Sequence, residues 1–272
     1  METEPTQGGI KPAYLLDNTW QHARQRLALL ESRLDSGTIH HLQDIGVGAG
    51  WRCLTVGSGG GSISEWLCKQ VGPSGHVVAT DINTRFLEAL DYPNLEVRQH
   101  DILADELEQT AFDLVHVRAL LMNIANPQRA LQRIVAALKP GGWLLVEEAD
   151  IASMAPQGSP EGPEGQLFLQ FREACVAALA SAGGDYHYGR RLYRDVCDQE
   201  LEGIQTEGRL HLAHGGTALG RFWRLNLEQM HEALVRHGGL TEEQLETTRR
   251  LFDSPAFAFT TSTVWAVWGQ RP

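Results

Sequence analysis

The feature that most constrains the fold of this chain is an alternation of short apolar runs and helical segments through its first half. Runs rich in Val, Leu and Ile are typical of buried strands, and the segments between them carry apolar residues at helical spacing. Strands that alternate with helices indicate a parallel, doubly wound sheet and therefore an α/β fold. The predicted strands are 52–56, 75–81, 95–99, 112–117 and 143–147, with helices at 63–70, 84–90 and 127–138.

The regions on either side of this alternation are predicted to be mainly helical. Apolar residues at steps of three and four after Asp17 indicate a helix with Asp17 as its N-cap, followed by a second short helix. A Pro- and Gly-rich loop at 156–165 precedes a further helix, and Thr241 opens a capping box. The predicted helices are 17–34, 36–45, 166–182, 219–236 and one after 241, with strands at 209–214 and 258–268.

Charge restricts the classes of partner. The chain has 34 acidic and 23 basic residues, a formal net charge of −11, and no long run of Lys and Arg. Such a charge repels phosphate backbones and anionic lipid surfaces. We therefore expect no nucleic-acid partner and no membrane partner.

Cysteine and histidine spacing restricts the compartment and the cofactor. The four cysteines lack CxxC spacing and are too few for a disulfide framework, which is typical of a reducing compartment. Residues 1–12 lack the apolar run of a signal peptide, and no apolar stretch reaches the ~18 residues of a membrane helix, so we expect a cytoplasmic protein. The eleven histidines show neither HxxxH nor HExxH spacing, and no metal site is expected.

A glycine turn follows the first predicted strand and precedes a helix. Glycines there let the backbone approach a ligand and present N–H groups at the positive end of the helix. A dinucleotide-binding turn needs GxGxxG, but Ser62 occupies the third glycine position. The spacing present is GxGxG, formed by Gly57, Gly59 and Gly61.

Two aspartates follow the next two predicted strands. Asp81 ends the second strand, where a carboxylate can accept both hydroxyl protons of an adenosine ribose. Asp101 follows the third strand, from where it can accept a hydrogen bond from an adenine amino group. A single aspartate at the end of a strand is more often a helix cap or a turn residue. Combined with the glycine turn, the two aspartates indicate a nucleoside site.

From Tyr14 to Pro272 the chain resembles the class I methyltransferases that depend on S-adenosylmethionine (SAM), in particular an actinobacterial-type subgroup that acts on small molecules. The resemblance rests on the glycine turn and on four further blocks. It implies SAM as the cofactor and a seven-stranded, mostly parallel Rossmann-like sheet with an antiparallel last strand at 258–268. The four blocks are Gly50-Trp51-Arg52-Cys53-Leu54, residues 75–81, residues 112–118 and Leu138-Lys139-Pro140-Gly141-Gly142.

The resemblance also implies which residues contact the cofactor. The glycine turn would lie against the methionine half of SAM, Asp81 against the ribose and Asp101 against the adenine. Trp20 would belong to an N-terminal cover that closes over SAM, although it also fits the apolar stripe of its helix. The cofactor-binding residues predicted in this way are Tyr14, Trp20, Arg24, Gly57, Ser58, Gly59, Gly61, Ser62, Asp81, Ile82, Asp101, Ile102 and Arg118.

Position 55 departs from the family pattern. Similar enzymes usually carry Glu or Asp two residues before the first glycine, whereas this chain has Thr55. A hydroxyl supplies no charge, and loss of a charge-assisted hydrogen bond would weaken SAM binding by ~1.5–3 kcal/mol. Three explanations stay open: threonine is tolerated, an acidic side chain reaches the turn from elsewhere, or the sequence has been altered at this position.

Acceptor contacts are expected at the ends of the fourth and fifth strands and after the lid helix. Methyl transfer needs alignment of a nucleophile and, for some acceptors, a general base. His187 is the strongest candidate base because its ordinary pKa lies near neutrality, although a solvated loop position is the commoner explanation. Arg118 pairs either with the SAM carboxylate or with an acidic neighbour, and Asn123 stands where similar sequences often have His. The predicted catalytic residues are His187, Arg118 and Asn123, and the predicted acceptor-binding residues are Asn123, Glu148, Tyr186, His187, Tyr188 and Arg190.

These observations divide the chain into four predicted parts. Residues 1–46 form an N-terminal helical cover, 47–150 the SAM-binding Rossmann-like core, 151–200 an inserted helical lid and 201–272 the C-terminal part of the core sheet. The predicted function is in-line methyl transfer from SAM to a small molecule, an aromatic natural-product intermediate by resemblance. The alternatives are a SAM-binding protein without methyl transfer, either a regulatory module or a cyclase, and an NAD(P)-dependent oxidoreductase, which Ser62 disfavours. The oligomeric state stays open, with a homodimer as one option.

Overall fold

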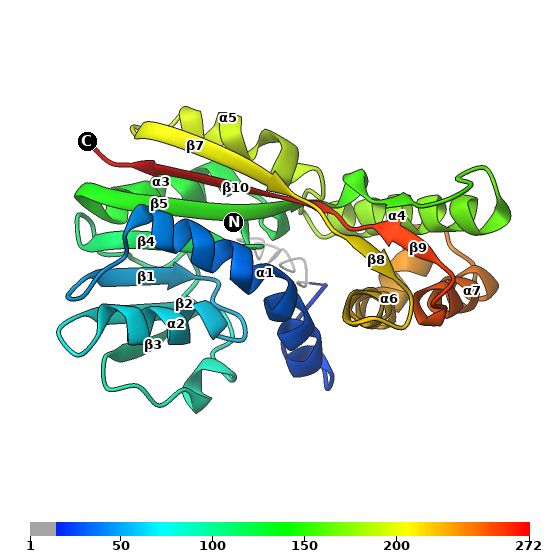
Figure 1. The fold of residues 1–272 in the computed structure, drawn as a ribbon, viewed down its shortest axis with the longest axis horizontal. Coiled ribbons are helices and arrows are strands. Elements are labelled where there is room, and N and C mark those ends of the chain that lie inside the picture. Colours follow the sequence, from blue (N-terminus) through cyan, green and yellow to red (C-terminus); the bar gives the residue numbers. More distant parts are fainter. Residues whose placement is uncertain (1–14) are drawn as a thin grey trace, which may run out of the picture.

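The computed structural model describes residues 15–272, and a seven-stranded sheet forms its centre (Figure 1). From one edge to the other, the strands are β3 Leu95–Gln99, β2 His76–Asp81, β1 Arg52–Val56, β4 Phe112–Arg118, β5 Leu138–Asp150, β10 Thr263–Gln270 and β7 Glu202–Arg209. Strands β1 to β5 pair in parallel, whereas β10 pairs antiparallel with both β5 and β7. The predicted α/β fold with a mostly parallel, Rossmann-like sheet is confirmed.

Helices cover both faces of this sheet. They are α1 Ala23–Ile45 and α2 Ser62–Val71 on one face, and α3 Pro127–Ala137 and α5 Leu192–Cys197 on the other. Because successive side chains of a strand point to opposite faces, each inner strand contributes to two apolar cores. Leu114 and Leu145 pack under α1 and α2, whereas Val115 and Leu144 pack against the opposite helices.

The N-terminal helix differs from the prediction. In place of a helix capped by Asp17 and a second short helix at 36–45, the structure has the single helix α1, which begins at Ala23 after a series of turns. The Asp17 carboxylate instead accepts the N–H of Thr19 at 2.7 Å, within a local turn. The helix continues through position 36 because its buried face extends from Leu34 to Leu42 and Ile45 without a break.

Two predicted strands are each divided between two sheets. The strand predicted at 209–214 separates into β7 and β8, and the one predicted at 258–268 separates into β9 and β10. Thr261, which lies between β9 and β10, donates its N–H to His211 O at 2.9 Å, so the two chain segments cross together from one sheet to the other. The second sheet has the order β6-β9-β8, with β6 Ala155–Pro156, β9 Ala258–Thr260 and β8 Leu212–His214.

Three helices pack with this second sheet at one end of the molecule (Figure 1, right). They are α4 Pro163–Ser181, α6 Ala218–Arg236 and α7 Glu242–Asp253, and we call them, together with the second sheet, the helical cap. Its core is aromatic: Phe168 lies 6.2 Å from Phe252 and 5.3 Å from Phe259, measured between ring centroids. Both 151–200 and 201–272 contribute to the cap, and the four-part division of the chain stays a prediction.

Short 3-10 helices join these elements. The helix predicted at 84–90 is reduced to one such turn, because only Leu87 of that segment is buried against the core. The capping box predicted at Thr241 is present, with the Thr241 hydroxyl accepting the Gln244 N–H. The 3-10 helices are η1 Leu87–Ala89, η2 Leu121–Asn123, η3 Ile151–Ser153 and η4 Tyr188–Arg191.

Candidate active site

A pocket of about 490 Å³ lies at the carboxyl ends of the parallel strands, between the sheet, α1 and the helical cap. Its lining changes character along the sheet, and we name its two ends by their residues. The polar half consists of the glycine turn from Gly57 to Gly60, the segment from Asp81 to Asn83 and the segment from His100 to Ile102. The apolar half consists of Ala149, Ile151, Tyr186, Phe222, Trp223, Asn226, Met230, Ser262 and Val264.

The glycine turn owes its path to backbone angles that other residues rarely adopt. Gly57, Gly59 and Gly61 have φ values of +69°, +58° and +89°, all in the left-handed region that favours glycine. A Cβ atom at Gly61 would also come within 2.7 Å of the Leu90 side chain. The turn therefore brings bare backbone to the pocket at the N-terminus of α2.

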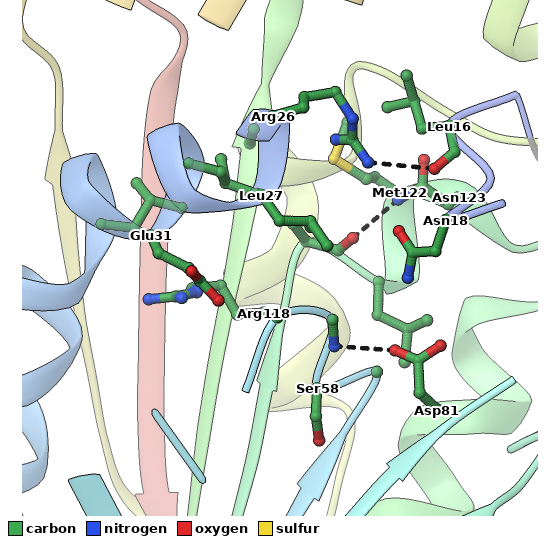
Figure 2. Close-up of a pocket in the computed structure, with 18 of the residues that line it drawn as sticks. Leu16, Asn18, Arg26, Leu27, Glu31, Ser58, Asp81, Arg118, Met122 and Asn123 are labelled. Atoms are coloured by element: carbon green, nitrogen blue, oxygen red, sulfur yellow. Dashed lines mark hydrogen bonds between the residues drawn. The ribbon is translucent and has the colours of Figure 1, made fainter. Parts of the chain in front are cut away.

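Asp81 is held at the end of β2 by the turn itself. Its Oδ2 accepts the N–H of Gly59 at 2.9 Å, the dashed line that ends on Asp81 in Figure 2. Its Oδ1 accepts the N–H of Asn83 at 3.0 Å. The side chain is largely buried, and burial raises its pKa. Because each carboxylate oxygen can accept two hydrogen bonds, both oxygens keep capacity for a ligand.

The remaining predicted residues of the polar half also line the pocket. Asp101 follows β3, and its Oδ1 accepts the N–H of Leu103 at 2.9 Å. Ile102 is buried, whereas Ile82 is 55% exposed. Two apolar side chains and a carboxylate thus surround the end of the pocket that lies beyond Asp81.

Carboxylates reach the glycine turn from α1 rather than from β1. The Thr55 hydroxyl is buried between the hydroxyls of Ser58 and Ser64, at 2.6 and 2.8 Å. On α1, Glu31 Oε1 accepts the N–H of Ser62 at 3.4 Å, and Asp35, one turn along, accepts the hydroxyl of the same serine at 3.0 Å. Glu31 lines the pocket, and burial raises its pKa. Of the three explanations for Thr55, the structure supports an acidic side chain from elsewhere.

Arg118 pairs with an acidic neighbour at the end of β4. Its Nη2 lies 2.9 Å from Asp35 Oδ1, and its Nη1 donates to the Thr38 hydroxyl at 2.9 Å. Figure 2 shows Arg118 and Glu31 at the same side of the pocket. The guanidinium therefore ties α1 to the sheet while it lines the pocket.

A buried polar pair lies beside Arg118. His116 Nε2 is 3.3 Å from Glu147 Oε2, which also accepts the Thr38 hydroxyl at 2.5 Å. Burial lowers the pKa of His116. Burial also acts to raise the pKa of Glu147, but the contacts with His116, Arg118 and Thr38 outweigh it and leave that pKa below its ordinary value. Both side chains line the pocket, and sequence reasoning did not select His116 because it lies within a strand.

Several predicted cofactor residues lie outside the pocket lining. Tyr14 lies outside the described residues. Trp20 packs edge-on against His22, with ring centroids 5.1 Å apart. Arg24 has a 55% exposed side chain that pairs with Glu31 at 3.6 Å. Gly61 and Ser62 also lie outside the lining, because they form the N-terminus of α2 that follows the turn.

The segment after α4 contributes less to the pocket than predicted. Tyr186 lines it, whereas His187, Tyr188 and Arg190 do not. The physical reason is that η4 packs directly on β5: Tyr188 is fully buried there. Arg190 pairs with Asp150 of β5 at 2.8 Å, with its side chain half exposed.

Glu148, predicted to bind the acceptor, instead supports the backbone. It is fully buried, and its carboxylate accepts the N–H groups of Leu120, Leu121 and Met122 at 2.9, 2.7 and 3.3 Å. Burial raises its pKa to about 7 despite these donors. Asn123, which ends the segment that Glu148 holds, does line the pocket, and its Oδ1 is buried without a partner among residues 15–272.

The apolar half contains residues that sequence reasoning missed. Phe222, Trp223, Asn226 and Met230 share one face of α6, at helical spacing. The Trp223 Nε1 is buried and has no hydrogen-bond partner within the described part of the chain. In the sequence this face cannot be told from an ordinary core stripe, because both show the same apolar period.

Comparison with known proteins identifies part of the chain. Residues 54–146 match the family model for a methyltransferase domain. The methyltransferase str2 of Strobilurus tenacellus is 29% identical over 154 residues, which cover 56% of this chain and 54% of that protein. The ubiquinone/menaquinone biosynthesis C-methyltransferase UbiE of Hahella chejuensis is 35% identical over 111 residues, covering 38% of this chain and 45% of that protein. The chain thus spans about half the length of the curated relatives it matches.

A solved structure shares the fold. A candidate methyltransferase from Bacillus halodurans superimposes with a TM-score of 0.54 at 15% identity, covering 85% of this chain and 96% of that one. Within residues 15–272, no group of three or more His, Cys, Asp or Glu side chains could hold a metal ion, and no helix is long and apolar enough to cross a membrane. From the matched domain, the GxGxG turn and the sheet order, we conclude that the chain carries a class I methyltransferase domain whose cofactor is SAM.

Proposed function

We propose that this protein transfers a methyl group from SAM to a small, apolar, ring-bearing acceptor, such as an aromatic natural-product intermediate. The observation that carries this proposal is the contrast within one pocket, where a polar half suited to a nucleoside continues into an apolar half lined by aromatic side chains. When bound, SAM supplies an electrophilic methyl group on its sulfonium. The protein then has to align the acceptor opposite the sulfur and exclude water.

In the polar half, each proposed contact uses a residue that lines the pocket. The two oxygens of Asp81 accept the ribose hydroxyls while keeping their bonds to the turn. Asp101 accepts from the adenine amino group, and Ile82 and Ile102 cover the adenine ring. The glycine turn lets the methionine half of the cofactor approach the backbone.

Glu31 supplies the negative charge that Thr55 lacks. Both the amino group and the sulfonium of SAM are positive, so a carboxylate beside them stabilises the bound cofactor. Asp35 is already paired with Arg118, whereas Glu31 lines the pocket and has Arg24 as a more distant ion partner. The cofactor thus adds a second positive partner to Glu31 at the glycine turn.

In the apolar half, aromatic side chains bind the acceptor ring. Phe222 and Trp223 of α6 line this half together with Val264 of β10 and Ile151 of η3. Aromatic side chains bury large apolar areas and stack on rings. The name of UbiE assigns that relative to ubiquinone/menaquinone biosynthesis as a C-methyltransferase, which supports a ring-bearing acceptor here.

The test measures cofactor binding and methyl transfer separately. SAM and NADH are titrated by calorimetry, and the protein is then incubated with radiolabelled SAM and a panel of apolar phenols, naphthols and quinols. Labelled product, lost in the Asp81→Ala variant at low SAM, supports the proposal. SAM binding without label in any acceptor would favour the SAM-binding alternative, and binding of NADH alone would favour the oxidoreductase.

A further inference from the structure

Arg33 of α1 is a partly buried cation without a carboxylate partner in residues 15–272. Its Nη2 donates to Thr261 Oγ1 at 3.0 Å, Ser262 O at 2.6 Å and Ser262 Oγ at 3.3 Å, all neutral oxygens. Its Nε is buried with no hydrogen-bond partner. Burial lowers its pKa to about 10, so the group stays protonated at neutral pH. Arg33 lines the 490 Å³ pocket.

The groups around Arg33 do not neutralise it. His211, beside β8, has its pKa lowered by burial and by the positive charges of Arg33 and Arg209. The carboxylates of this region are bound elsewhere: Glu207 to Arg209 at 2.6 Å, and Glu147 to His116 and Thr38. A local positive region therefore exists inside a chain with a net charge of −11.

Arg33 lies at the end of the pocket away from the nucleoside site. It is anchored by Thr261 and Ser262, which immediately precede β10, whereas Asp81 ends β2. In the sheet order, β10 is four strands from β2, a separation of roughly 19 Å at about 4.8 Å per strand. Arg33 thus borders the apolar half, where the proposed acceptor lies.

An unpaired buried charge is costly, and an anionic ligand group would remove that cost. Guanidinium groups pair with carboxylates through short, charge-assisted hydrogen bonds. We propose that Arg33 binds a carboxylate of the acceptor, so that the substrate class is apolar ring compounds that carry a carboxylate. This inference rests on the proposed function, because it assigns the apolar half to the acceptor.

A pair of matched probes tests the inference. The probes are 6-hydroxy-2-naphthoate and its neutral carboxamide, titrated by fluorescence into protein saturated with S-adenosylhomocysteine. We expect the naphthoate to bind wild type at least about tenfold more tightly than the carboxamide, and Arg33→Met to remove this preference. Arg33→Lys should keep part of it, because the charge remains.

Arg172→Met is the matched control, since Arg172 on α4 pairs with Glu173 at 2.6 Å and does not line the pocket. It should bind both probes as wild type does. Equal binding of the naphthoate by wild type and Arg33→Met, including no binding by either, would overturn the inference. A loss of S-adenosylhomocysteine affinity in Arg33→Met would also overturn it, because Arg33 would then hold the cofactor.

The outcome is separable from that of the proposed function. The preference for naphthoate is measured by binding, without turnover. If wild type prefers naphthoate but transfers no label to any acceptor, the anion site is supported and methyl transfer is rejected. If Arg33→Met does not fold, as judged by its melting curve, Arg33→Lys is the deciding variant. Its ammonium cannot reproduce the guanidinium contacts, so part of the preference for naphthoate should be lost. An unchanged preference would overturn the proposal that Arg33 binds the carboxylate.

Discussion

The two halves of the pocket are built from the chain in opposite ways. The polar half comes from a single stretch, from Gly57 to Ile102, in which each strand end contributes three or four residues. The apolar half draws on β5, η3, α6 and β10, which extend over more than a hundred residues of the chain, and Arg33 of α1 borders it. The nucleoside site therefore comes from neighbouring strand ends within one part of the sequence. The acceptor site depends on which distant elements the fold brings together.

The halves also differ in how their polar groups are satisfied. In the polar half, Asp81 is held by two backbone N–H groups before any ligand binds. In the apolar half, the Trp223 indole N–H and the Arg33 Nε have no partner in residues 15–272. Hydrogen-bond acceptors that are already held in place suit the constant groups of a cofactor. Hydrogen-bond donors without a protein partner suit a substrate that supplies the missing hydrogen bonds.

The largest effect is expected from Asp81→Ala, which acts on the polar half. SAM affinity should fall by ~1.5–3 kcal/mol because charged hydrogen bonds to the ribose are lost. Calorimetry measures this change, and naphthoate binding should stay at the wild-type level. Asp91→Ala, an exposed aspartate in a loop, is the control. Unchanged SAM affinity in Asp81→Ala would remove Asp81 from the site.

Glu31→Gln should weaken SAM binding about tenfold, because a neutral amide replaces the carboxylate beside the cofactor's positive groups. Burial raises the pKa of Glu31 above its ordinary 4.5. SAM, as a cation, binds the ionised form, so wild-type affinity should fall as the pH is lowered through that raised pKa.

The pH dependence distinguishes Glu31 from a merely structural residue. In Glu31→Gln the SAM affinity should vary less between pH 5 and neutrality than in wild type, in calorimetry at constant ionic strength. Asp44→Asn, on the same helix but exposed and paired with His40, should behave as wild type. An equally steep pH profile in both variants would show that another group carries the charge.

Trp223→Phe should raise the acceptor KM by about three- to tenfold and leave kcat and SAM affinity unchanged. The substitution keeps an aromatic ring but removes the unpartnered indole N–H of a residue that lines the apolar half, and with it the neutral hydrogen bond that we expect the acceptor to supply. Trp265→Phe is a matched control, because the Trp265 Nε1 is also buried without a partner in the described chain but lies outside the pocket. Equal effects of the two substitutions on the acceptor KM would show that Trp223 acts through packing alone and not through its N–H.

The smallest effect is expected from His187→Ala, less than about twofold in kcat and KM, because its side chain does not line the pocket. As a general base it would instead account for 10²–10⁴-fold in rate. Steady-state kinetics across neutral pH separates the two. A large loss of rate together with a lost inflection near neutrality would restore His187 to the mechanism.

The lid prediction shows where sequence reasoning reaches its limit. Tyr186 to Arg190 was expected to form the acceptor wall because it follows a helix and a Pro- and Gly-rich loop. In the structure Tyr186 lines the pocket, but the rest of this segment packs on β5, with Gly189 in close contact with the β5 backbone, and α6 supplies the other aromatic side chains of the lining. Nothing in a short polar segment specifies which of two neighbouring surfaces it will meet.

The sequence by itself determined the parallel sheet, the glycine turn and the two aspartates at strand ends. These depend on hydrophobic period and turn chemistry, which act over a few consecutive residues. Only the tertiary structure decided that α1 brings Glu31 to a turn that lacks its own carboxylate, and that Arg33 is partly buried without a carboxylate partner in the described residues. The reason is physical: charge pairing and burial are properties of side chains that meet in space, here between α1 and residues that lie 31 and 229 positions away in the sequence.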